Sequence, residues 1–278
     1  MTIVNFVETE GIGPSARVWG KMALPYGPGF YRTQSGNPAI GHFDDLLKVS
    51  DTSLEDGYIR LQTASGTVTQ IASEANAYGI TRLTSAADND EAVIQLGNGL
   101  DVGPFRLLTD FAFEARVRIN AAGIVAGDHG FFIGMATGGS AGAAIANKMF
   151  TTGDAIFATA DFCGFQHLKG ESTALDAMYQ ASGQTKVDGA VDTDLDTVHT
   201  LVASTWVKLG FRFQATKPRK MIWYVDGAQV CQIEETSVAA AGFPDAATAF
   251  MQPTVGIRGV DATSAYLDID WLGCAMLL

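Results

Sequence analysis

The chain has 278 residues, and its 18 basic and 30 acidic side chains give a formal net charge of −12. An acidic excess of this size argues against a protein that binds nucleic-acid phosphates or an anionic membrane by charge. Hydrophobic residues make up 47 % of the sequence, which is ample for a sizeable core and excludes disorder over most of the chain.

Residues 1–53 are expected to form an extended arm. Glycine and proline recur here too closely for long helices or strands to form without support. The stretch also has too many aromatic residues for a disordered linker, so we expect it to lie against its own domain or a neighbouring subunit. The aromatic residues assigned to contacts with another subunit or a capsid are Phe6, Trp19, Tyr26, Phe30 and Tyr31.

Residues 54–278 are expected to form one β-sandwich domain. Short runs of alternating apolar and polar residues are separated by clusters of Ser, Gly, Asn and Asp, which is typical of antiparallel strands. In the clearest run, Phe111 and Phe113 fall on one face while Glu114 and Arg116 fall on the other. Strands are expected at 58–62, 68–71, 79–84, 92–96, 111–120, 130–136, 155–161, 162–168, 206–214, 221–225, 229–233, 254–258 and 265–275.

Turn and helix signals support an all-β fold. Asp226 and Gly227 separate two of these runs and predict a hairpin with a tight turn. Helix formers gather at 172–182 and 236–249, where we expect helical insertions of one or two turns. About a dozen antiparallel strands without long helices between them predict a sandwich or jelly roll rather than a parallel α/β sheet.

Two loop motifs leave alternatives open. Gly138–Gly142 match the G-x-S-x-G turn that presents a serine nucleophile, here Ser140, but the surrounding strands are antiparallel, so a hydrolase is a remote alternative. Asp192, Asp194 and Asp196 alternate as in a calcium loop. The Gly and Glu of an EF-hand are missing from it, so an irregular calcium site stays open beside the simpler reading of a solvated acidic loop.

A glycosidase needs two carboxyl groups about 5 to 9 Å apart, usually supplied on sheets of this type by alternating acidic residues such as E-x-D-x-E. No such run occurs in the chain. Asp268 and Asp270 come nearest, and their alternation with apolar residues predicts that both lie on an exposed strand face. The protein is therefore expected to be non-catalytic and to carry no cofactor.

Other residues offer little chemistry. The four histidines show no ligand spacing, and the three cysteines lie in apolar runs and are expected to be buried thiols. Residues 1–10 carry two glutamates and no cation, so no signal peptide is expected. No stretch is apolar enough to predict a membrane span, and the chain is expected to be soluble before assembly.

Several strand pairs resemble the concanavalin A-like jelly rolls, of the laminin-G and laminarinase-like kind. The likeness rests on 205–213, where a Trp opens a strand, on 222–230, where Tyr-x-Asp-Gly ends the next strand, and on 111–119, 131–136 and 267–272. It covers roughly residues 54 to 278 and implies a jelly-roll β-sandwich. The acidic strand of the enzymes with this fold is absent, and no lectin metal motif can be matched residue by residue.

A narrower likeness is to virion proteins of tailed bacteriophages. These share a Gly/Pro-rich N-terminal arm and an LT-x-x-ADNDEA element, here Leu83–Ala92. The resemblance implies a capsid decoration protein on the head exterior, with the major capsid protein and copies of itself as partners. A glycan-binding module, possible also for attachment to a host surface, is the alternative from another functional class.

Overall fold

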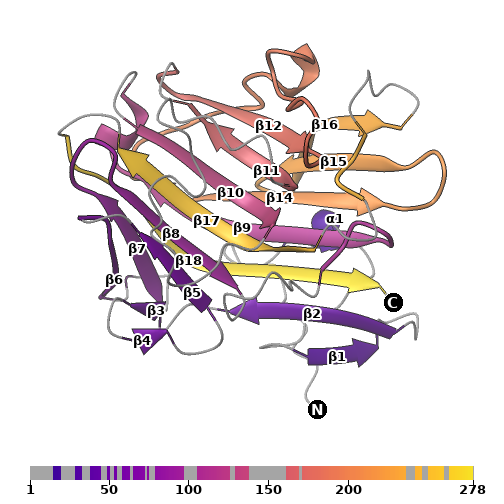
Figure 1. Cartoon of the computed structure of the whole chain (residues 1–278), viewed down its shortest axis with the longest axis horizontal. Coiled ribbons are helices and arrows are strands. Elements are labelled where there is room, and N and C mark those ends of the chain that lie inside the picture. The colour runs from indigo at the N-terminus through magenta and orange to yellow at the C-terminus, as the bar shows by residue number, and fades with distance from the viewer. Residues whose placement is uncertain are drawn as a thin grey trace.

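The computed structural model describes residues 15–19, 29–32, 38–44, 49–50, 53–54, 58–62, 65–72, 74, 79–96, 105–125, 129–137, 161–168, 171–235, 242–245, 250–259 and 263–277. They form a nine-stranded sheet, a seven-stranded sheet and a two-stranded pair, and every strand pairing is antiparallel (Figure 1). None of the helices in these residues is long and apolar enough to cross a membrane.

The larger sheet has the order β1-β2-β18-β9-β14-β15-β16, with β7 and β6 continuing from the other half of β18. Its longest strand, β18, pairs with β9 along one edge and with β2 and β7 in succession along the other. The strands are β1 (Gly29–Arg32), β2 (Pro38–Asp44), β6 (Thr67–Ile71), β7 (Ile80–Ser85), β9 (Phe111–Ile119), β14 (Val207–Gln214), β15 (Lys220–Val225), β16 (Ala228–Glu234) and β18 (Ala265–Leu277).

The smaller sheet has the order β13-β12-β11-β10-β17-β8-β5. These strands are β5 (Tyr58–Gln62), β8 (Glu91–Leu96), β10 (His129–Thr137), β11 (Phe162–His167), β12 (Ala174–Gln180), β13 (His199–Thr200) and β17 (Met251–Gly259). A short pair joins β3 (Val49–Ser50) to β4 (Ser53–Leu54). The helical turns are α1 (Ala16–Trp19), η2 (Ala122–Ile124) and η3 (Thr193–Leu195).

The core lies between the two sheets and follows the alternation of the strands. Phe111, Phe113 and Phe211 stack across β9 and β14, with ring centroids 5.8 and 5.5 Å apart, as their shared face predicted. From the larger sheet, Trp223 reaches across the core and donates its indole N–H to the carbonyl oxygen of Gly164 on β11, at 3.0 Å. All three cysteines are free and buried, which confirms the prediction made for them.

The β15–β16 hairpin is confirmed. Asp226 and Gly227 both have positive φ, at 48° and 76°, which is the backbone of the tight turn whose twist matches paired strands. Glycine adopts such angles without steric cost, and aspartate is among the residues that tolerate them best.

The ADNDEA element forms a corner between the sheets, because it joins β7 of the larger sheet to β8 of the smaller one. Asn89 has a φ of 63°, and its amide N–H donates to the carbonyl oxygen of Gly259 at 3.0 Å. The Gly259 N–H donates in return to the Asp90 carbonyl oxygen at 2.9 Å, and Arg258 binds the Asn89 side chain. A Cβ on Gly259 would lie 2.2 Å from the Ser85 hydroxyl oxygen. These contacts give residues of the ADNDEA element a structural role at this corner.

One helix prediction is wrong and several expectations lie outside the described residues. Residues 174–180 of the expected helix 172–182 form β12, because Leu175, Ala177 and Tyr179 alternate into the core and the strand pairs with β11. Pairing and burial thereby outweigh the helix preference of Ala and Met. The serine motif 138–142 lies outside the described residues, as do nearly all of the strand expected at 155–161 and most of the insertion expected at 236–249.

The N-terminal region contributes strands to the larger sheet. β2 pairs with β18 from Ala39 opposite Leu277 to Asp44 opposite Leu272, and β1 pairs with β2. A Gly/Pro-rich stretch can therefore form strands where the edge of a neighbouring strand, here β18, supplies the hydrogen bonds.

Candidate functional site

The aspartates nearest to a glycosidase motif belong to a network of ion pairs on the larger sheet. The strand register places Asp268 of β18 opposite Arg82 of β7 on one side and Arg118 of β9 on the other. Arg82 Nε lies 2.7 Å from Asp268 Oδ1, and Arg118 Nε lies 2.9 Å from Asp268 Oδ2. A second bond from Arg82 reaches Oδ2 at 2.9 Å, so three N–H donors hold this carboxylate.

The prediction that Asp268 and Asp270 lie on an exposed strand face is wrong. Their exposed fractions are 0 % and 4 %. Asp270 sits where the β18–β9 register shifts between Ile269 and Trp271, and it forms an ion pair with Arg116. Parts of the outer face of this sheet are covered, because α1 packs near Trp271 and Trp206 lies against Arg116 and Arg118. Through these arginines, the two aspartates connect β18 with the strands beside it.

Trp206 is held against this network by two guanidinium groups. The central carbons of Arg116 and Arg118 lie 4.7 and 4.6 Å from its ring centroid. Arg118 in turn makes a bidentate pair with Glu74, at 2.7 and 2.6 Å, and this hydrogen bonding lowers the pKa of Glu74. Cation–π contact with two fixed arginines gives the indole a defined orientation.

A small cavity opens beside Trp206, at the end of the sandwich where β9 ends and β14 and β18 begin. Its volume is about 90 Å³, and its apolar floor belongs to the core between the sheets. Arg118, His199, Thr205, Trp206 and Asp226 are also among the residues that line it. The complete lining is Val117, Arg118, Ile119, Phe131, His199, Leu201, Val202, Thr205, Trp206, Val207, Leu209, Asp226 and Leu267.

Two polar residues of the lining already have partners within the chain, since Asp226 Oδ1 accepts the Lys208 N–H at 2.9 Å and the Thr205 hydroxyl donates to the Ala203 carbonyl oxygen at 3.3 Å. Ser204 has a φ of 56°, a strained value for serine, and its N–H donates to the Ile119 carbonyl oxygen at 2.7 Å. Burial lowers the pKa of His199, although the Asp226 carboxylate acts in the opposite direction, so its imidazole is neutral at pH 7. Val202 at the mouth is 60 % exposed, so solvent reaches the cavity.

A second cluster lies at the β12 edge of the smaller sheet. Burial, followed by the charge of nearby Asp176, raises the pKa of Glu171 to about 7. Burial also raises the pKa of Asp176, whose Oδ1 accepts the Thr197 N–H at 2.8 Å. With a pKa of about 7, Glu171 is partly protonated near neutral pH, as an acid–base group would be. No motif spacing marks these residues, so sequence reasoning missed them.

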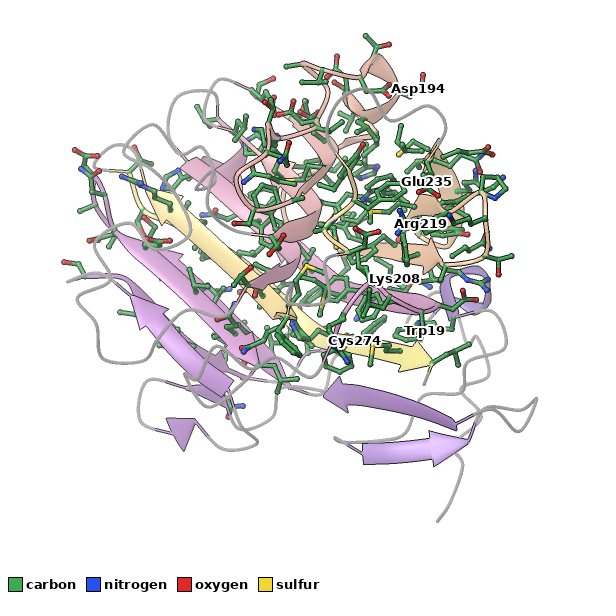
Figure 2. The ribbon with its side chains drawn as sticks, turned by 45° about the vertical axis from the view of Figure 1, so that its right-hand side comes forward. Trp19, Asp194, Lys208, Arg219, Glu235 and Cys274 are labelled. Atoms are coloured by element: carbon green, nitrogen blue, oxygen red, sulfur yellow. The ribbon has the colours of Figure 1, made fainter. Side chains whose placement is uncertain are left out.

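Trp19 is the predicted contact residue with the best-defined environment. Its indole N–H donates to Glu114 Oε2 at 2.7 Å, and the Ser15 N–H donates to the same oxygen at 2.8 Å. The side chain is 4 % exposed and packs with Ile222 and Trp271, beside β14 and near Lys208 (Figure 2). Burial raises the pKa of Glu114. The contacts of Trp19 are thus within its own chain.

The other predicted site residues are not brought together. Phe30 and Tyr31 lie in β1, while Phe6, Tyr26 and Ser140 are outside the described residues. In the aspartate loop, Asp192 accepts the Asp194 N–H at 3.0 Å and Asp196 accepts the Thr197 hydroxyl at 2.9 Å. Within the described part of the chain, no three His, Cys, Asp or Glu side chains are placed to hold a metal.

Comparison with solved structures shows the fold. A protein of unknown function from Shewanella oneidensis MR-1 is 16 % identical with a TM-score of 0.56, over 89 % of this chain and 90 % of that one. An endo-β-1,4-glucuronan lyase from the fungus Trichoderma reesei is 10 % identical with a TM-score of 0.51, over 84 % and 94 %. The potassium-bound carbohydrate recognition domain of Emp46p is 10 % identical with a TM-score of 0.50, over 83 % and 94 %.

No family model and no curated protein matches the sequence. The structural likenesses confirm the expected concanavalin A-like β-sandwich. Identities of this size show the fold alone.

Proposed function

We propose that the chain is a non-catalytic structural protein of a tailed-phage virion that decorates the head exterior. The observation that carries the proposal is that Asp268 and Asp270, the acidic residues of β18, are buried and bound to arginines. Such ion pairs connect neighbouring strands, which is a structural use of these carboxylates. The likeness of Leu83–Ala92 to phage virion proteins supports the virion setting.

The arm is the proposed contact with the major capsid protein and with other copies of the chain. Residues 15–19 are fastened to Glu114, so the arm starts from a fixed point on the larger sheet. In this proposal Trp19 holds residues 15–19 against the larger sheet, and the other aromatic residues of the arm contact the partner subunits. These contact residues are Phe6, Tyr26, Phe30 and Tyr31.

Deleting residues 2 to 12 tests this role, because it removes Phe6 and leaves the anchor at Ser15 in place. We expect binding to capsids that lack this protein to fall about tenfold or more, as for the loss of an aromatic anchor at an interface. Co-sedimentation measures the binding, and circular dichroism and the melting temperature should stay unchanged. Full capsid binding by the shortened chain would contradict the arm contact.

Glycan binding is the second candidate, and Trp206 is the observation that favours it. Its ring lies against Arg116 and Arg118, and the residue is also part of the lining of the cavity. Rigid aromatic surfaces beside a few polar groups are typical of small-ligand sites. The fold shared with a carbohydrate recognition domain and a glucuronan lyase is consistent with this candidate.

Trp206→Ala tests the glycan candidate on a printed glycan array. We expect the wild-type protein to bind at least one class of glycan and the variant to bind it about tenfold less, since an aromatic stacking contact is worth up to about 1.5 kcal/mol. Leu108→Ala is the matched control, because Leu108 is 42 % exposed and precedes the opposite end of β9. Equal loss in both variants, or no glycan bound by the wild type, would count against this candidate.

A further inference from the structure

We propose that the seating of α1 on the larger sheet is coupled to a proton on Glu114, so that the start of the N-terminal arm is held at acidic pH and released as the pH rises. The inference goes beyond the proposed function, because it concerns how residues 15–19 are held and involves neither a capsid nor a glycan. It is drawn from the shape of the sheet under α1 and from the hydrogen bonds and burial of Glu114.

Two glycines make room for α1 on the outer face of the larger sheet. A Cβ on Gly210 of β14 would come within 3.1 Å of the Val18 side chain, and a Cβ on Gly227 would lie 3.0 Å from the Ser15 hydroxyl oxygen. Val18 has no exposed surface, and Trp19 is almost as deeply buried. The sheet therefore has a closely fitting seat for α1, and larger residues at these two positions would obstruct it.

Glu114 of β9 is the group through which the sheet holds α1. Its Oε2 accepts the Trp19 indole N–H at 2.7 Å and the Ser15 N–H at 2.8 Å. The side chain has no exposed surface, and Oε1 is buried without a hydrogen-bond partner among the described residues. An ionised carboxylate spreads its charge over both oxygens, so part of that charge would be buried without a donor. A protonated carboxyl group avoids this cost and still accepts both N–H groups through Oε2.

The groups around Glu114 do not remove this preference. Burial is the largest effect and raises the pKa of Glu114, whereas the hydrogen bonds from α1 and the charge of Lys208 on β14 act in the opposite direction. Arg116 of β9 and Arg212 of β14, on the same face, are each ion-paired with an aspartate. β15 contributes the phenol of Tyr224 to the cluster, and the α1 sequence adds one arginine and no acidic residue.

This burial links the proton to the seating of α1. α1 packs against β9 and β14, so its release uncovers Glu114 and returns the pKa towards the ordinary value of a glutamate, about 4.3. The seated state therefore binds a proton that the released state loses more easily. Seating is favoured most below the pKa of the released carboxyl group, and it weakens as the pH rises through the raised pKa of the seated one. Within that window, the ratio of seated to released chains falls by up to about tenfold for each pH unit.

Hydrogen exchange of the tryptophan indole N–H groups, followed by NMR on the intact protein, tests this coupling. Trp19→Phe assigns the Trp19 signal, and the exchange rate of a free tryptophan peptide at each pH corrects for the chemistry of exchange. We expect the protection of the Trp19 indole to fall about tenfold or more between about pH 5 and about pH 8. Trp223 is the internal control, because its buried indole donates to the Gly164 carbonyl oxygen and reports opening of the core. Its protection should not fall in parallel.

Glu114→Gln assigns the pH dependence to this carboxyl group. Its amide stays neutral, keeps an oxygen that accepts and carries a donor as a carboxylic acid does. We expect the Trp19 protection of this variant to be independent of pH and similar to that of the wild type at about pH 5. Glu74→Gln is the matched control, since it changes a more exposed glutamate bound to Arg118 of the same sheet and should keep the wild-type pH dependence.

The outcomes decide between a neutral and an ionised Glu114. If the protection of Trp19 does not fall with pH relative to that of Trp223, or if Glu114→Gln lowers it at every pH, an ionised carboxylate holds the arm and the proposal is overturned. A fall that Glu114→Gln removes and Glu74→Gln retains supports the proposal. The wild-type comparison gives a result even if Glu114→Gln fails to fold. Capsid and glycan binding play no part in the measurement, so its failure is distinct from failure of the proposed function.

Discussion

Asp268→Ala will lower the free energy of unfolding by about 3 to 5 kcal/mol, which is the usual cost of removing one partner from a buried ion pair. Asp268 has no exposed surface and holds Arg82 and Arg118 with three N–H donors. Without it, two guanidinium groups lose their common partner, and three strands lose the side chain that links them. The expected effect is a large part of the stability of an ordinary domain.

Urea denaturation monitored by tryptophan fluorescence measures this cost. Glu74→Gln is the matched control, because Glu74 binds Arg118 in the same network but its side chain is 43 % exposed. An exposed pair contributes about 1 kcal/mol or less. If Asp268→Ala costs no more than Glu74→Gln, the network does not reinforce the sheet, and the structural reading of its carboxylates is wrong.

The core residues could be predicted from the sequence because strand periodicity is a local property. Phe111, Phe113 and Phe211 fall on one face by alternation alone, and they stack as that face requires. The Asp226–Gly227 turn is equally local, since its positive φ values are a property of the two residues. For these elements, burial on one side of a strand is enough to determine the structure.

The environment of residues on the outer faces could not be predicted in the same way, because it depends on contacts between residues far apart in the sequence. Alternation places Asp268 on the side opposite the core, but it says nothing of Arg82 and Arg118, which bind its buried carboxylate there. The pair Glu171 and Asp176 was missed for the same reason, since burial raises the pKa of both groups, the charge of Asp176 raises that of Glu171 further, and neither effect shows in the spacing. Candidate sites in this chain depend on partners that lie far apart in the sequence.

The same limit explains the helix predicted at 172–182. Ala and Met favour a helix in isolation, whereas in the fold Ala177 and Tyr179 are buried and paired with β11. The alternation of Leu175, Ala177 and Tyr179 into the core is the signal that could have identified a strand.

Trp19→Ala will lower the free energy of unfolding by about 3 kcal/mol, near the lower end of the range for removing a large buried aromatic side chain. The indole is 4 % exposed, and its loss leaves a cavity among Ile222, Tyr224 and Trp271. It also removes one of the two N–H donors to Oε2 of Glu114, a buried carboxyl group whose desolvation already raises its pKa. The variant should release residues 15–19 before the rest of the domain unfolds, because these losses fall on the anchor.

Two measurements separate release of the anchor from general destabilisation. Limited trypsin digestion followed by mass spectrometry should show faster loss of N-terminal peptides in Trp19→Ala, and denaturation gives the total cost. Trp206→Ala is the matched control, since it removes the same side chain from the surface of the same sheet and should leave the N-terminal peptides protected. Unchanged protection in Trp19→Ala would mean that β1 and β2 hold the arm without the anchor. In that case the proposed capsid contact would start from the sheet edge at Gly29.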